Sequence, residues 1–242
     1  MTILEKFKKK RDNLKGESPI TVAFLGDSVT QGCFADQINS AGYLDTTFDA
    51  ENAYHTKFRK IFNLLYPNVP LNIINAGISG GNAVEGLDRI ERDVLRFNPD
   101  LCIVCFGLND SVLTDPADMF EKYQASLDGI FKKLKERDIE VIFMTPNMMC
   151  TKVCGNVSEV LKGAAETCSK VQTEGRLDMF IDAAREVAKK NNVPICDCYA
   201  KWKLMYEKGV NTNDLLEGPV NHPNNKINWM FAYSLVETIF MN

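Results

Sequence analysis

Three polar turns and one histidine are the features of this chain whose residue types and spacing could perform chemistry together. The turns are Asp27-Ser28, Ser79-Gly80 and Gly107-Leu108-Asn109-Asp110, and the histidine is His222. Each turn follows a short apolar run, whereas His222 lies in a polar segment late in the chain, residues 211–225. A serine, a histidine and turns that offer N–H donors are the parts of an acyl-transfer site. In such a site the serine attacks, the histidine takes its proton, and the donors bind the oxyanion.

Ser28 occupies the position at which a nucleophile would be most useful. The apolar, β-branched run over residues 20–26 predicts a buried strand that stops at Gly26. In open α/β sheets, ligands bind at the carboxyl ends of the strands. A serine hydroxyl is a poor nucleophile until an adjacent base takes its proton, and a histidine, with an ordinary pKa near ~6.5, suits that task.

The other polar residues at strand ends have simpler interpretations. Glycine with Asp, Asn or Ser is ordinary turn chemistry, so Asp27 and Asp197 are expected to brace turns. The chain has only two histidines. His55 falls on a predicted helix over residues 53–66, where a surface histidine or a satisfied core histidine is expected. His222 therefore carries the catalytic hypothesis.

Four blocks in this order resemble those of the SGNH (GDSL-type) hydrolases, and they span residues 26–224. The blocks are Gly26-Asp27-Ser28, Gly80 within Asn75-Ala76-Gly77-Ile78-Ser79-Gly80, Gly107-Leu108-Asn109-Asp110, and His222-Pro223-Asn224. The resemblance implies ester hydrolysis, with Ser28 as nucleophile and His222 as general base. It also implies an oxyanion hole formed by the N–H groups of Ser28 and Gly80 and by the side-chain amide of Asn109.

One position departs from the family pattern. Members commonly carry an Asp three residues before the histidine, and here that position is Pro219. Asp214 and Glu217 are close in sequence and could orient His222 instead. A backbone carbonyl could also do so, which would give a Ser–His dyad. The sequence leaves these alternatives open.

Strands and helices are predicted to alternate along nearly the whole chain. Strands are expected at residues 20–26, 71–74, 101–106, 140–145 and 193–198. This order predicts one α/β domain over residues 1–242, a doubly wound parallel sheet of about five strands. The resemblance adds that it is a flavodoxin-like, three-layer α/β/α fold. Residues 1–18 are expected to form a leading arm with a solvated helix, and the segments 33–52 and 147–171 to shape the acyl and alcohol pockets.

Composition limits the partners and the compartment. The net charge of −4 gives no reason to expect nucleic acid or an anionic membrane surface, and no apolar stretch is long enough to cross a bilayer. Eight cysteines without a secretory signal favour a reducing, cytoplasmic location. Cys102 and Cys105 resemble a metal-binding pair, but residues three apart on a strand face opposite sides. No metal and no cofactor are expected.

Two functions compete on this basis. The first is a serine esterase that acts on a small or carbohydrate-linked acyl ester, such as an acylated sugar. The alternative is a non-catalytic or weakened flavodoxin-like module that binds a phosphate-bearing ligand at helix N-termini. His222 separates the two, because phosphate binding does not require it.

Overall fold

The computed structural model describes residues 1–38, 40–41, 44–113 and 116–242. Five strands form the main sheet in the order β4-β1-β5-β6-β7, and all neighbouring pairs are parallel. These strands are β1 (Ile20–Gly26), β4 (Leu71–Gly77), β5 (Leu101–Cys105), β6 (Glu140–Met144) and β7 (Ile195–Cys196). The predicted doubly wound parallel sheet is confirmed.

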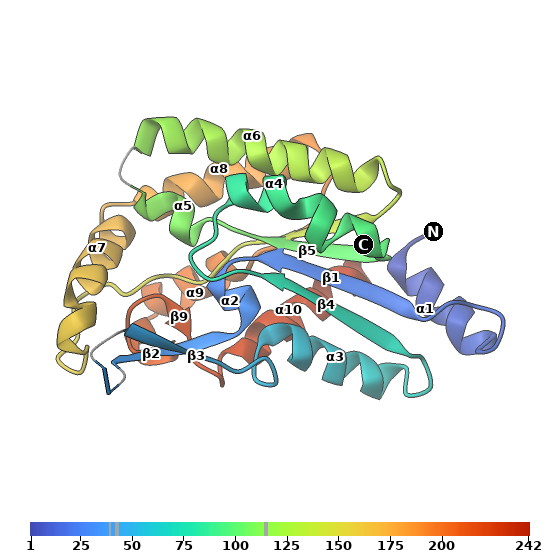
Figure 1. Cartoon of the computed structure of the whole chain (residues 1–242), viewed down its shortest axis with the longest axis horizontal. Coiled ribbons are helices and arrows are strands. Elements are labelled where there is room, and N and C mark those ends of the chain that lie inside the picture. The colour runs from blue at the N-terminus through green and yellow to red at the C-terminus, as the bar shows by residue number, and fades with distance from the viewer. Residues whose placement is uncertain (39, 42–43, 114–115) are drawn as a thin grey trace.

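Helices cover both faces of the sheet and give three layers (Figure 1). They are α1 (Ile3–Asp12), α2 (Ser28–Gln31), α3 (Tyr54–Leu65), α4 (Ala83–Asp93), α5 (Leu108–Val112), α6 (Pro116–Lys135), α7 (Lys162–Thr173), α8 (Arg176–Lys190), α9 (Cys198–Glu207) and α10 (Asn228–Met241). Side chains from α4 and α6 fill the core on one face, those from α1, α3, α9 and α10 fill the core on the other, and α8 contributes to both.

Alternation along the central strands explains why both faces are buried. In β1, Val22 and Phe24 belong to one core, and Ala23 and Leu25 belong to the other. A strand that is apolar on both sides needs a helical layer on each side to remove those side chains from water. Cys102 and Cys105 follow the same rule: both are buried in β5, each in a different core, as the expected strand requires.

The leading helix differs from the solvated helix that the sequence suggested. The α1 side chains Ile3 and Phe7 are buried, and the Phe7 ring lies 4.7 Å from that of Phe62 on α3. Lys8, Lys9 and Arg11 remain exposed, Lys10 is buried, and Lys6 forms an ion pair of 2.9 Å with Asp100. The buried side chains of Ile3 and Phe7, one turn apart, dock this otherwise charged helix.

The predicted loop over residues 33–52 contains a β-hairpin instead. Strands β2 (Cys33–Ile38) and β3 (Leu44–Phe48) pair in antiparallel fashion, apart from the main sheet. Their sequences mix apolar and polar residues, so no continuous apolar run marks them as strands. Backbone pairing with each other, rather than burial in the main sheet, defines these two strands.

The parallel arrangement brings three turns to one edge of the sheet. Strands β1, β4 and β5 lie side by side, and the turns after them begin at Asp27, Ile78 and Phe106. Because the strands are parallel, these turns share the carboxyl edge, where open α/β sheets bind ligands. Within the described ranges, no helix has the length and apolar character that crossing a membrane requires.

Candidate active site

Ser28 is held by a short turn directly after β1. Asp27 caps α2, and its carboxylate accepts the N–H of Val29 at 3.0 Å. Gly32 ends the helix in the left-handed conformation and donates its N–H to the carbonyl of Ser28. As the first residue of α2, Ser28 also carries one of the N–H groups that a helix leaves unused at its start. The expected role of Asp27 as a brace of this turn is confirmed.

His222 approaches Ser28 from a different part of the fold. It lies in the short strand β9 (His222–Pro223), which pairs with β8 (Leu216–Glu217). Its Nε2 is 2.9 Å from the Oγ of Ser28, which is hydrogen-bond distance. Its Nδ1 is 3.6 Å from the Sγ of Cys33 on β2. The structure thus brings together the two residues on which the catalytic hypothesis depends.

The segment after β6 fixes the chain around His222. The amide of Asn147 donates to the carbonyl of Asn221 at 2.7 Å, and the N–H of Cys150 donates to the carbonyl of Val220 at 2.8 Å. Asn147 is fully buried. Sequence reasoning missed it, because a single polar residue after a strand gives no sign that it holds a backbone 74 residues away.

The two candidates for a third catalytic residue are both exposed. Asp214 lies in a 3-10 turn (Thr212–Leu215), and Glu217 lies directly opposite His222 in the β8–β9 pair. Side chains of directly opposed residues leave an antiparallel ribbon on the same face. In the described part of the chain, neither carboxylate forms a hydrogen bond or an ion pair. Of the two, Glu217 is therefore better placed to orient the His222 imidazole, although its carboxylate does not contact that ring.

The loop over residues 77–83, here called the oxyanion loop, leaves one N–H group unused. Acceptors within the protein hold the N–H groups of Gly77, Ile78, Ser79, Gly81, Asn82 and Ala83. All seven residues of the loop are described, and Gly80 alone has an N–H without an acceptor. Gly80 has a φ of 75°, which favours glycine, and the space where its Cβ would lie is empty. This N–H is therefore available to a bound ligand.

Asn109 can supply a second donor beside Gly80. It lies on α5, and its Nδ2 donates to the carbonyl of Gly81 at 2.8 Å. An amide group has two N–H bonds, so the second can point to a ligand. The contact with Gly81 also ties Asn109 to the oxyanion loop, which fixes the relative position of the two candidate donors.

These groups share one cavity of about 520 Å³. Its lining residues are Ser28, Thr46, Ser79, Gly80, Asn109, Val112, Leu161, Gly163, Ala164, Thr167, Cys168, Val220, Asn221 and His222. None of them is Asp, Glu, Lys or Arg. The segment 147–171 was expected to shape a pocket, and Leu161 with the first half of α7 does form one wall. Such a cavity suits an uncharged ligand with an apolar part.

Two buried carboxyl groups lie next to the candidate catalytic residues in sequence. Burial, together with the nearby Asp110, raises the pKa of Asp27 to about 7. Burial likewise raises the pKa of Asp110 to about 7. Asp110 accepts the N–H of Ala83 at 2.9 Å through Oδ1, and its Oδ2 is buried without a partner among the described residues. Each carboxyl group therefore holds a turn by accepting backbone N–H groups, although burial disfavours its charged form.

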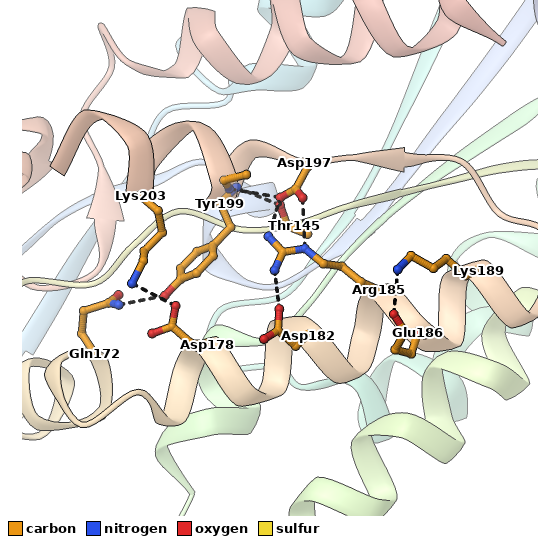
Figure 2. A network of polar contacts seen from close by, with 11 residues as sticks. Thr145, Gln172, Asp178, Asp182, Arg185, Glu186, Lys189, Asp197, Tyr199 and Lys203 are labelled. Atoms are coloured by element: carbon orange, nitrogen blue, oxygen red, sulfur yellow. Dashed lines mark hydrogen bonds and ion pairs between the residues drawn. The ribbon is translucent and has the colours of Figure 1, made fainter. Parts of the chain in front are cut away.

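A polar network begins near the carboxyl end of α7 (Figure 2). Gln172 on α7 donates to the hydroxyl of Tyr199 and accepts the N–H of Met149. Next to it, Asp197 accepts hydrogen bonds from Thr145 and Arg185 and caps α9. Burial raises the pKa of Asp197, but the hydrogen bonds from Arg185, Ala200 and Thr145 and the charge of Arg185 together outweigh it, so the pKa lies below its ordinary value. The expected bracing role of Asp197 is confirmed.

His55 lies outside the cavity, as a satisfied core histidine. Its Nε2 is 3.2 Å from the amide nitrogen of Asn75, and its Nδ1 is 3.2 Å from the hydroxyl of Thr56. The amide must donate, so Nε2 accepts and the proton is on Nδ1. Burial, together with the charge of Arg59, lowers the pKa of His55 to about 4. The ring is thus neutral near pH 7, and the structural interpretation of His55 is confirmed.

Comparison with known proteins gives one family and a set of related structures. The model of the GDSL-like lipase/acylhydrolase family matches residues 24–229. An acetylxylan esterase from Geobacillus stearothermophilus is 25% identical over 130 residues, which cover 51% of this chain. The match spans 58% of that relative's length.

Solved structures of esterases share the fold. A catalytic mutant of an acetylxylan esterase from Geobacillus stearothermophilus superposes with a TM-score of 0.66 at 22% identity, over 92% of this chain and 94% of that one. A lipase/acylhydrolase from Enterococcus faecalis gives 0.66 at 21%, over 91% and 95%. A two-domain esterase active on acetylated mannans gives 0.66 at 19%, over 99% of this chain and 53% of that one.

Proposed function

The chain belongs to the GDSL-like lipase/acylhydrolase family, and on this premise we propose that it is a serine ester hydrolase with Ser28 as its nucleophile. His222 is the general base, and Gly80 and Asn109 provide the oxyanion hole together with the N–H of Ser28. The observation that carries the proposal is the 2.9 Å contact between Ser28 Oγ and His222 Nε2, in a cavity that also holds the unused N–H of Gly80.

The geometry supports a two-step reaction. The Ser28 oxygen forms a bond to the acyl carbon while its proton moves to Nε2 of His222, and the carbonyl electron pair moves onto oxygen. The N–H of Gly80 and the amide of Asn109 stabilise this oxyanion. Collapse breaks the bond to the alcohol, which leaves with the proton from His222. Water then repeats the sequence on the acyl-enzyme and releases the acid.

This mechanism needs no third catalytic residue as long as Nδ1 of His222 carries the ring proton. The Sγ of Cys33 lies 3.6 Å from that nitrogen. Because the proton moves only between Ser28 and His222, a Ser–His dyad is compatible with this step. If a carboxylate completes a triad, Glu217 is the better placed of the two candidates, because it lies opposite His222 in the β8–β9 pair.

We assign the substrate to small acyl esters of uncharged alcohols, with acylated sugars as the first class to test. Among the described residues that line the cavity there is no Asp, Glu, Lys or Arg, which favours a neutral substrate. Relatives of this chain include an acetylxylan esterase and an esterase active on acetylated mannans. An acetyl group on a sugar hydroxyl meets both conditions.

A fluorophosphonate probe tests the nucleophile directly. The parent protein is expected to carry the adduct on Ser28 and to hydrolyse p-nitrophenyl acetate, whereas Ser28→Ala does neither. Ser158→Ala, which removes an exposed serine, serves as the matched control and should behave like the parent. Acetylated xylose, acetylated mannose and longer p-nitrophenyl esters then define the substrate. Equal hydrolysis by Ser28→Ala and the parent would refute the proposal.

The phosphate-binding alternative receives less support from the site. A phosphate site usually includes Lys or Arg, and the lining residues that the structure describes contain neither. A rise in melting temperature with nucleotides, together with an unlabelled Ser28, would favour that alternative over the esterase.

A further inference from the structure

Gln31 connects the helix that carries Ser28 to the oxyanion loop. It is the last residue of α2, three positions after Ser28. Its side-chain Oε1 accepts the N–H of Ser79 at 2.7 Å. Its backbone carbonyl accepts a hydrogen bond from the amide of Asn75 at 3.1 Å. One residue therefore holds both the end of β4 and the loop that follows it.

The contact between these two segments is also tight at the backbone. A Cβ built on Gly77 would lie 2.2 Å from the backbone nitrogen of Gln31, so only glycine fits at this position. Ile78 extends the contact, because its N–H donates to the carbonyl of Gly26 at the end of β1. The start of the oxyanion loop cannot approach α2 more closely, and the hydrogen bonds of Gln31 keep it from moving away.

The side chain of Gln31 acts on the peptide next to the proposed oxyanion donor. The direction of the Gly80 N–H depends on the backbone of Ser79, whose own N–H is bound to Gln31. Without that acceptor, the Ser79 N–H would be unpaired and the loop could turn it toward the cavity. Of the remaining anchors to other segments, the bond from Ile78 to Gly26 lies before Ser79, and those of Asn109 at Gly81 and Asp110 at Ala83 lie after Gly80, so Gln31 holds the residue directly before Gly80.

From these contacts we infer that Gln31 is a positioning residue that sets the Gly80 N–H relative to the Ser28 hydroxyl. The inference rests on the ester hydrolase proposed above. Gln31 is not among the residues that line the cavity, so it acts through Ser79 rather than on the substrate. Donors aimed in advance at the developing oxyanion lower the barrier, and a misplaced donor loses part of that effect.

Substitution of Gln31 tests this role through the split between kcat and KM. Gln31→Met keeps the length and removes the acceptor, and Gln31→Asn keeps the amide but shortens its reach. Both are expected to lower kcat about tenfold and to leave KM within about twofold of the parent. The inhibition constant of a boronic acid, which mimics the tetrahedral intermediate, should rise by a similar factor. Gln124→Met, whose amide binds Phe120 within α6, is the matched control and should match the parent.

Amide hydrogen exchange supplies a second measurement, and its first comparison, between two amides of the parent protein, does not need a variant. In the parent, the N–H of Ser79 should exchange more slowly than the N–H of Gly80, and Gln31→Asn should remove the difference. Equal exchange of the two amides in the parent would overturn the inference even if Gln31→Met failed to fold. A kcat for Gln31→Asn within about twofold of the parent would also overturn the inference. Labelling at Ser28 in the parent would still support the ester hydrolase in that case. Absence of both labelling and hydrolysis in the parent would overturn both proposals.

Discussion

The Nε2 of His222 lies 2.9 Å from the Oγ of Ser28, although 194 positions separate the two residues in sequence. Ser28 is fixed by its capped turn after β1, and His222 by the β8–β9 pair and the contacts of Asn221 and Val220. Neither side chain has to move for a proton to pass between them. This contact gives the most direct prediction about activity.

Removal of the imidazole should abolish most of the activity and leave the fold intact. For His222→Ala we expect kcat/KM for p-nitrophenyl acetate to fall at least about a thousandfold, because the Ser28 hydroxyl loses its proton acceptor. The rate of fluorophosphonate labelling should fall with it. Thermal unfolding measured alongside serves as the control for folding. A variant that keeps more than about a tenth of the parent's activity would contradict the assignment of His222 as base.

Loss of the Asn109 amide should affect the transition state more than the bound substrate. Asn109→Ala removes one proposed oxyanion donor, so kcat should fall about a hundredfold with little change in KM. Asn109→Asp keeps the shape but places a carboxylate beside the oxyanion, and its kcat should be lower still. Steady-state kinetics on one ester separate the two parameters. An increase in KM at constant kcat would assign Asn109 to substrate binding instead.

The buried carboxyl of Asp110 should make the protein less stable as the pH rises. Its pKa is 3.8 in its ordinary state and about 7 in the fold, so between these values only the folded protein holds the proton. Its contribution to the free energy of unfolding is full below pH 4 and is lost as the pH rises through 7. Asp110→Asn removes this titration. Between pH 5 and pH 8, its melting temperature should gain about 3 °C or more relative to the parent. Parallel melting curves for the two proteins would argue against a protonated Asp110.

Titration of His55 should instead make the protein less stable as the pH falls. Its pKa is 6.5 in its ordinary state and about 4 in the fold, so between these values only the unfolded chain binds the proton. The contribution of His55 to the free energy of unfolding is therefore full above pH 6.5 and is lost as the pH falls toward 4. We expect the parent to lose about 2 kcal/mol relative to His55→Gln between pH 7 and pH 4.5. Urea unfolding at each pH measures this difference, and a difference that does not vary with pH would exclude a buried neutral His55.

The sequence was sufficient to predict the layered fold and the edge at which the candidate site lies. Residues 20–26 and 101–105 are apolar on both faces, which only a covered parallel strand allows, and polar turns follow such strands. Their order along the chain also matched the blocks of a known family. The pairing of β2 with β3 and the docking of α1 were not predicted, because backbone pairing defines the first and a few buried contacts define the second, and neither leaves a long apolar pattern.

By itself, the sequence determined which residues are candidates for the chemistry: their types, their order and the strands that they follow are local properties that periodicity and turn composition encode. The tertiary structure alone decided how these residues meet. The approach of His222 to Ser28, the unused N–H of Gly80 and the bond from Gln31 to Ser79 depend on segments that are distant along the chain. Such contacts follow from the packing of whole elements, which no window of sequence contains.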